Sequence, residues 1–182
     1  MITDCHVHIH PMEMFRPEAL ELVKHNRPNF DQIAEFGRSP ASFLKYLDEA
    51  GVDRAVLINY VAPDFIGFTP DINQYVADYT KENPRRLISC GGLHPRQSQN
   101  IMSEVEQFLR LKIRAIKLHP PHQLLFPNDY LHGVKELEVI YRAAEANGLP
   151  VIFHPERQSS KAHETVMETR CIWTMLRWTS PS

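Results

Sequence analysis

Residues 114–154 contain the pattern that decides the fold: RAIKLHPPHQLLFPNDYLHGVKELEVIYRAAEANGLPVIFH. The segments 114–119 and 150–154 are short and nearly continuously apolar, as buried parallel strands are. Between them, residues 132–147 have the apolar spacing of an amphipathic helix, and Gly148 marks its end. A strand, a crossover helix and a second strand predict a βαβ unit.

The same alternation extends back to the N-terminus. The later strands begin near residues 54, 86, 114 and 150, and spacings of about thirty residues fit one βαβ unit each. The sequence therefore predicts an α/β fold with a helix-covered parallel sheet. Because neither GxGxxG nor GxxxxGK[ST] occurs, a nucleotide-binding fold loses its main support, and a β/α barrel is favoured. The other expected elements are strands at 2–8, 54–60 and 86–93, helices at 17–25, 40–50, 70–83 and 98–111, and a loop-rich stretch over 11–38 around the first helix.

Composition excludes several classes of function. The chain has 182 residues, and its net charge of −2 gives no support to nucleic-acid binding. No apolar run approaches the roughly 20 residues that a membrane span needs. Cys5, Cys90 and Cys171 are far apart, with neither a metal-finger spacing nor a disulfide framework. We therefore expect a cytoplasmic protein.

The first expected strand carries Asp4, His6 and His8 at alternate positions. Side chains two apart share a face of a strand, so these two imidazoles can converge on one metal ion, with Asp4 as a supporting group. The alternative is a pair of histidines that happen to share a strand. His154 ends the fifth strand, where β/α barrels place functional groups, and would complete a set of three histidines that suits Zn²⁺.

Lys117 and His119 share a face of the fourth strand. Polar side chains facing a barrel interior are costly unless they have a partner or a role, so both are candidates to contact substrate or metal. The alternative is that both are solvated at the end of the strand. His94, at the end of the third strand, is a weaker candidate to contact substrate or metal, and we expect His10 and His122 to lie at the barrel mouth.

Three motifs together resemble the amidohydrolase superfamily: D-x-H-x-H, I-K-L-H-P and P-V-I-F-H. Residues 1–154 are most similar to its amidohydrolase-related group, which includes metal-dependent hydrolases and aminocarboxymuconate-semialdehyde-type decarboxylases. The resemblance implies a (β/α)8 TIM barrel, present here for about its first five strands, with one or two divalent metals at its mouth. It also implies metal binding by His6, His8 and His154. Lys117 matches the strand that holds a carbamylated lysine in two-metal members, whereas the family's later histidine and aspartate have no match here.

Residues 155–182 differ in character from residues 1–154, since they have no glycine and no clear strand. Shifting the reading frame by one base forces glycine at the junction of residues 167 and 168. The same shift forces aspartate directly after both Trp173 and Trp178. These residues suit the family's own continuation, so we expect a barrel part over 1–154 and an irregular, frameshifted tail over 155–182.

These observations support several hypotheses about function. The first is a metal-dependent hydrolase, in which metal-activated water attacks an amide, ester or lactone. The alternatives are a decarboxylase that uses the same site, an inactive truncated fragment or at best a metal-binding half-barrel that pairs with itself, and a binding module. Arg96, Lys117 or His119 could steady a substrate carboxylate. We expect a small-molecule substrate and consider a homo-oligomer.

Overall fold

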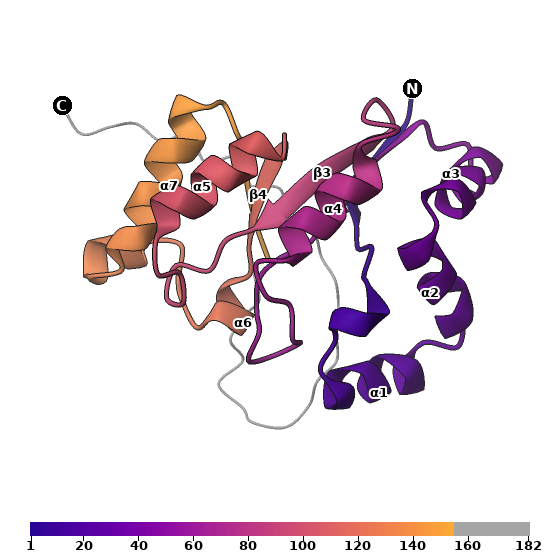
Figure 1. Cartoon of the computed structure of the whole chain (residues 1–182), viewed down its shortest axis with the longest axis horizontal. Coiled ribbons are helices and arrows are strands. Elements are labelled where there is room, and N and C mark those ends of the chain that lie inside the picture. Colours follow the sequence, from indigo (N-terminus) through magenta and orange to yellow (C-terminus); the bar gives the residue numbers. More distant parts are fainter. Residues whose placement is uncertain (155–182) are drawn as a thin grey trace.

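Five parallel strands form one sheet in the computed structural model, which describes residues 1–154. The strands lie side by side in chain order, and every neighbouring pair is parallel. The sheet curls as the first part of a barrel does, which confirms the expected partial TIM barrel (Figure 1). The expected tail at 155–182 lies outside the described residues. The strands are β1 (Thr3–Val7), β2 (Arg54–Ile58), β3 (Leu87–Gly92), β4 (Ala115–Leu118) and β5 (Val151–Phe153).

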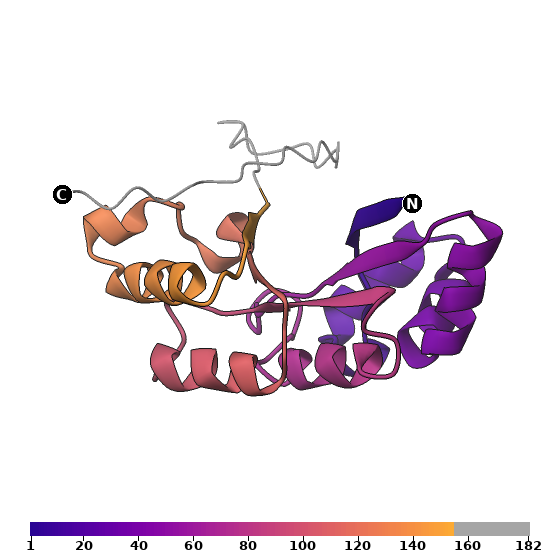
Figure 2. The same cartoon turned by 90° about the horizontal axis from the view of Figure 1, so that it is seen from above.

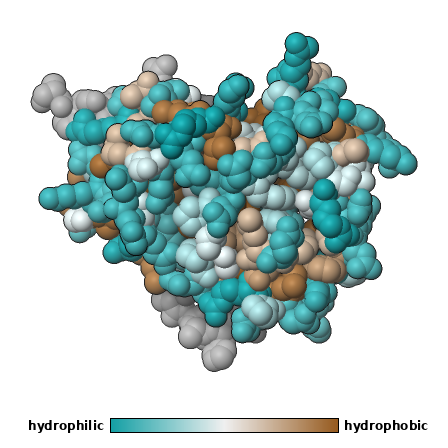
Figure 3. Space-filling model, viewed as in Figure 1, coloured by the Kyte–Doolittle hydropathy of each residue, from teal (hydrophilic) through white to brown (hydrophobic). Residues whose placement is uncertain are grey.

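Helices connect successive strands, and α4 and α5 run along one side of the sheet (Figure 2). On the side of the molecule where these helices lie, the outer surface is mainly hydrophilic, with hydrophobic residues scattered over it (Figure 3). No helix of residues 1–154 is both long and apolar enough to cross a membrane. The connecting helices are α3 (Pro40–Glu49), α4 (Ile72–Thr80), α5 (Ile101–Arg110) and α7 (Lys135–Ala146), with shorter turns at η1 (Met12–Met14), α6 (Pro120–Gln123) and η2 (Asp129–His132).

The region expected to be loop-rich contains two helices, α1 (Pro17–Asn26) and α2 (Phe30–Arg38). The expectation was wrong for α2, which buries Ala34 and Gly37. A Cβ atom on Gly37 would lie 2.2 Å from the main-chain oxygen of His10, so this glycine permits the close packing of α2 on the chain after β1. Tertiary packing, rather than local sequence preference, thus explains the helix.

The sheet has two faces with different partners. Leu57, Ile116 and Leu118 belong to the large core that also contains the helix residue Leu137. Neighbouring residues of these strands point the other way, because side chains alternate along a strand. They form a separate small cluster of Ile58, Cys90 and Ala115, with Val56 and Ile152 packed against it. This second face is the inner face of the partial barrel, and it carries the candidate site at the carboxyl ends of the strands.

Candidate active site

His6 and His8 come together at the end of β1. Their Nε2 atoms are 3.1 Å apart, and their rings meet edge to face with centroids separated by 4.9 Å. Two nitrogens bound to one zinc ion at the usual bond length are about 3.3 Å apart at the tetrahedral angle. The two rings therefore present a pair of nitrogens with the spacing of metal ligands, as the alternation in the sequence predicts.

Pairing of β1 with β2 is irregular between Asp4 and Val7. Asp4 pairs with Ala55 and Val7 with Leu57, so β1 contains one residue more than β2 over this interval. Because of this extra residue, the side chains do not alternate regularly between the two faces of the strand from Asp4 to the histidines, contrary to expectation. The Asp4 carboxylate instead accepts a hydrogen bond from the main-chain N–H of His6 at 3.0 Å.

His154 follows β5, and its ring stacks on His119 with centroids 4.5 Å apart and planes inclined by 11°. Its charge acts on both His6 and His8, since it lowers the pKa of each. No three His, Cys, Asp or Glu side chains within residues 1–154 are placed to hold a metal ion together. The structure thus assembles the His6–His8 pair, and the set completed by His154 stays a prediction.

Lys117 is fully buried on β4, next to this group of histidines. Its positive charge lowers the pKa of His6, His8 and His119. The side chain thus occupies the interior position that its place in the strand predicts. A buried cation beside the candidate site favours the binding of a negatively charged group there.

His6, His8 and His119 are held in the neutral form. Burial is the largest cause that lowers the pKa of His6, and it lowers the pKa of His8 much further. Burial also lowers the pKa of His119 to about 2, with contributions from His122, His154 and Lys117. Neutral imidazoles keep the lone pairs that metal binding requires.

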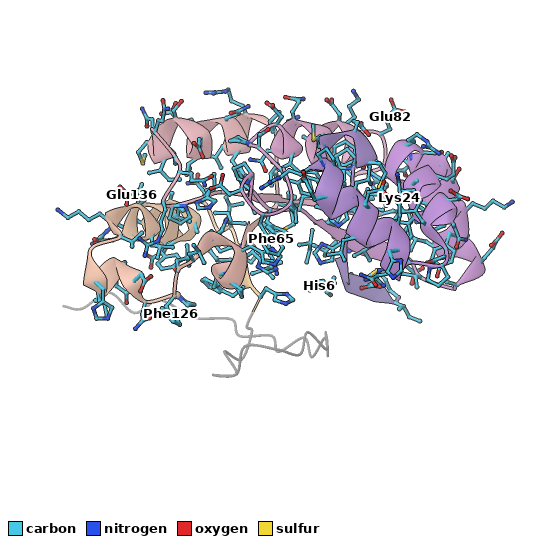
Figure 4. All side chains as sticks on the ribbon, turned by 90° about the horizontal axis from the view of Figure 1, so that it is seen from below. His6, Lys24, Phe65, Glu82, Phe126 and Glu136 are labelled. Carbon is cyan, nitrogen blue, oxygen red and sulfur yellow. The ribbon has the colours of Figure 1, made fainter. Side chains whose placement is uncertain are left out.

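Tyr60, at the end of β2, is a site residue that the sequence reasoning missed. Its hydroxyl group and His122 Nδ1 are 2.9 Å apart and hydrogen-bonded, and its ring stacks on His119 with centroids 4.4 Å apart. His122, which the sequence predicts at the mouth, also stacks on Phe65, with ring centroids 3.7 Å apart. His6 and Phe65 both lie on the side of the sheet opposite α4 and α5 (Figure 4).

Two buried amides, also missed, hold the strand ends in place. Gln123 Nε2 donates to the carbonyls of Val61 and Leu93, and Gln123 Oε1 accepts from the main-chain N–H of His119 at 3.0 Å. Asn73 donates to the carbonyl of Gly92 and accepts from its N–H, both at 2.8 Å. No sequence motif indicates the contacts of Gln123 with Val61 and Leu93 or of Asn73 with Gly92, because they join segments that are distant in the chain.

Other candidates lie in different surroundings. His94 lines a small cavity with Ser98 and Glu104. Arg96, considered for carboxylate binding, forms an ion pair with Asp129 at 3.3 Å. The ring of His10 packs beside that of His8, with centroids 5.4 Å apart. Burial lowers the pKa of His10 to about 4.

Comparison with known proteins identifies the family. The family model described as Amidohydrolase matches residues 3–177. The chain belongs to the amidohydrolase family. No curated amidohydrolase or other curated protein matches it significantly. The amidohydrolase match extends beyond residue 154, where the expected barrel part ends, and the domain boundary there stays a prediction.

Solved structures also resemble this amidohydrolase chain. An uncharacterized TIM-barrel protein from Bordetella bronchiseptica superimposes with a TM-score of 0.60 at 20% identity, covering 84% of this chain and 54% of that one. A 5-carboxyvanillate decarboxylase from Novosphingobium aromaticivorans, solved with manganese and 3-methoxy-4-hydroxy-5-nitrobenzoic acid, superimposes with a TM-score of 0.53 at 14% identity. That match covers 85% of this chain and 49% of the decarboxylase. The chain thus spans about half the length of both structures.

Proposed function

We propose that this chain carries the metal-binding part of a metal-dependent hydrolase site that acts on an amide, ester or lactone. The observation that carries the proposal is the 3.1 Å separation of the Nε2 atoms of His6 and His8 at the end of β1. Membership of the amidohydrolase family supports the same class of reaction. The proposed substrate is a small molecule. Cytoplasmic location and a homo-oligomeric state stay predictions.

The donor set of the site fits a divalent cation, for which we propose Zn²⁺. His6 and His8 would hold it, with His154 as the third ligand. Burial keeps the His6 and His8 rings neutral by lowering the pKa of each. His8 Nδ1 is buried and has no hydrogen-bond partner within residues 1–154, so His8 interacts through Nε2, which faces His6. A divalent cation there would lower the pKa of a bound water and polarise a substrate oxygen.

Lys117 and His119 are the proposed catalytic residues. The charge of Lys117 would attract a substrate carboxylate, or the negative charge that develops on an attacked carbonyl. His119 is fixed from two sides, because Gln123 accepts from its main-chain N–H and Tyr60 stacks on its ring. Its burial keeps the ring neutral, so His119 acts as a hydrogen-bonding group rather than as a cation.

Decarboxylation is the second candidate function. The fully buried Lys117 favours it, since a cation at this position would hold a carboxylate substrate beside the histidine pair. The similarity of fold to a manganese-containing decarboxylase is consistent with this alternative. Under it, the same residues would bind an acid that loses CO₂.

Metal content tests the proposed site directly. Zn²⁺ or Mn²⁺ is added to the purified chain, excess metal is removed, and the bound metal is measured by mass spectrometry. We expect His6→Ala and His8→Ala each to lose most of the metal held by the wild type. His132→Ala is the matched control, because His132 is exposed and lies on η2. Equal metal content in all four proteins would refute the proposal.

Two assays separate the candidate reactions in the metal-loaded protein. A panel of amides, esters and lactones is assayed for hydrolysis, and a panel of carboxylic acids is assayed for release of CO₂. Turnover that is lost in His6→Ala and retained in His132→Ala identifies the reaction. Turnover of carboxylic acids alone would replace hydrolysis by decarboxylation.

A further inference from the structure

A small cavity, called here the loop cavity, lies between the loops that follow β2 and β3. Three apolar residues form one of its walls: Val61, Pro63 and Pro70. The other wall is polar and consists of His94, Gln97, Ser98 and Glu104. None of the proposed metal ligands or catalytic residues lines the cavity, so a ligand held there is recognised by other groups.

The loop cavity is small, and its walls are held in place. Its volume is about 190 Å³. A cavity of roughly 150 Å³ admits benzene, whereas pockets for drug-sized ligands measure roughly 300–1,000 Å³. Gln123 joins the two walls, because it donates to the carbonyls of Val61 and of Leu93, the residue before His94. A preformed cavity of this size suits a molecule of a few non-hydrogen atoms.

The polar wall offers acceptors to a ligand, because its donors are engaged within the wall. The Ser98 hydroxyl donates to Glu104 Oε1 at 2.7 Å, which fixes the carboxylate. The other oxygen of Glu104 has neither a hydrogen bond nor an ion pair within residues 1–154. Gln97 Nε2 donates to the Asp64 carboxylate. The wall therefore complements a ligand that is rich in hydrogen-bond donors.

His94 adds an acceptor of the same kind. Its side chain is 6% exposed, and its Nδ1 has no hydrogen-bond partner within the described part of the chain. Burial lowers the pKa of His94 below the ordinary value of 6.5, so at neutral pH the ring is uncharged and keeps a lone pair.

The charges around the loop cavity favour a cation. Glu104 lies in its wall, and the negative charge of Asp64 also acts on His94, where it opposes the effect of burial. Arg96 acts on His94 more weakly than Asp64, and its own charge is paired with Asp129 at 3.3 Å. Negative charge in a partly enclosed cavity attracts positively charged ligands.

We propose that the loop cavity binds a small primary ammonium ion, with Glu104 as its counter-ion. The ammonium group would donate to the unpaired oxygen of Glu104 and to the lone pair of His94, and its alkyl group would lie against the apolar wall. A metal ion fits less well, because no three His, Cys, Asp or Glu side chains of residues 1–154 are placed to hold one. This second ligand site goes beyond the proposed function and does not depend on it.

Propylammonium tests the site in the metal-free chain, by ligand-observed NMR titration at constant ionic strength. The reference ligands are 1-propanol, which has no charge, and propionate, which has the opposite charge. We expect propylammonium to bind at least tenfold more tightly than either. Glu104→Gln should raise its Kd about tenfold, since the amide can still accept from Ser98 but has lost the charge.

Glu106→Gln is the matched control, because Glu106 is exposed on the same helix and pairs with Arg110. It removes the same charge away from the cavity, so the Kd should stay unchanged. If Glu104→Gln alters the near-ultraviolet circular dichroism, Ser98→Ala carries the test, and it should raise the Kd about threefold by releasing the carboxylate.

Two results would overturn the inference. One is that the wild type binds propylammonium no more tightly than 1-propanol and propionate. The other is that the variants at positions 104 and 98 both bind propylammonium as tightly as the wild type. A loss of affinity confined to Glu104→Gln and Ser98→Ala supports the site, whatever the metal content of the chain.

Discussion

Gln123 donates a hydrogen bond from Nε2 to the main-chain carbonyl of Leu93 at 2.8 Å, which ties the turn after β4 to the end of β3. The same nitrogen donates to the carbonyl of Val61 at 2.9 Å, beyond the end of β2. One buried amide therefore holds three strand ends together. These strand ends carry Tyr60 and His119, so the amide also fixes the positions of these two site residues.

We expect Gln123→Ala to lower the free energy of unfolding by about 3 kcal/mol, because it leaves buried main-chain groups without partners. Urea unfolding followed by circular dichroism measures the loss. Gln74→Ala is the control, since Gln74 bonds Asp78 on the exposed side of α4, and we expect a change under about 0.5 kcal/mol. Similar losses in both variants would show that the buried amide has no special role.

Asn73 presents both halves of its amide to Gly92, donating from Nδ2 and accepting at Oδ1. Asn73→Asp turns the donor into an oxygen that faces a carbonyl, and at pH 7 it also buries a charge. We expect a loss of about 3 kcal/mol in unfolding free energy at pH 7. Burial raises the pKa of such a carboxyl group, so the loss relative to wild type should shrink as the pH falls towards 4.5.

Asn147→Asp is the control for this substitution, because Asn147 bonds the carbonyl of Ala143 at an exposed position. Its effect should be small at both pH values. A loss for Asn73→Asp that stayed constant from pH 7 to pH 4.5 would contradict the explanation by charge.

Gly92 leaves no room for a side chain. A Cβ atom there would lie 2.4 Å from the Cα of Tyr60 and 2.5 Å from the nitrogen of Val61, both in the main chain. We expect Gly92→Ala to destabilise the fold by about 2–3 kcal/mol. At Gly148 a Cβ atom meets open space, and only the left-handed backbone opposes it, so Gly148→Ala should cost about 1 kcal/mol. Urea unfolding of both variants checks this order, and the reverse order would contradict it.

Acid should destabilise the fold through His122. Burial lowers its pKa in the folded state to about 4, below the ordinary value of 6.5. Below pH 6.5 the unfolded chain binds the proton more readily, so stability falls as the pH drops from 6.5 towards 4. Allowing for partial exposure, we expect His122→Asn to reduce the loss between pH 6.5 and 5 by roughly 1 kcal/mol. Urea unfolding at both pH values measures it, and His25→Asn, at an exposed position on α1, should leave the loss unchanged.

The sequence predicts the strands well because each is a short apolar run bounded by turn residues. Residues 54–60 were expected to form a strand, and β2 spans Arg54–Ile58. The helix expected over residues 40–50 is α3, and the Ser39 side chain caps it by accepting from the N–H of Ser42 at 3.1 Å. The helix expected from residue 98 begins later, because Asn100 caps it while Ser98 bonds Glu104 instead.

In the site, as in the fold, the sequence indicates local arrangements but not contacts between distant segments. The His6–His8 pair follows from alternation within one strand, so the sequence alone indicates it. Tyr60 and His122 are 62 positions apart, as are Val61 and Gln123, and no local pattern connects them. Only the curvature of the sheet, which brings the ends of its strands together, determines those contacts.

Asp4 interacts with the main chain of β1 in the interval that contains the extra residue. Its carboxylate bonds the main-chain N–H of His6, and its charge is the weakest influence on the pKa of that ring. An asparagine at position 4 could accept the same bond, so the shape of the strand does not require the charge. The acid of this motif thus stabilises the main chain of β1 within the interval where the register of β1 with β2 shifts.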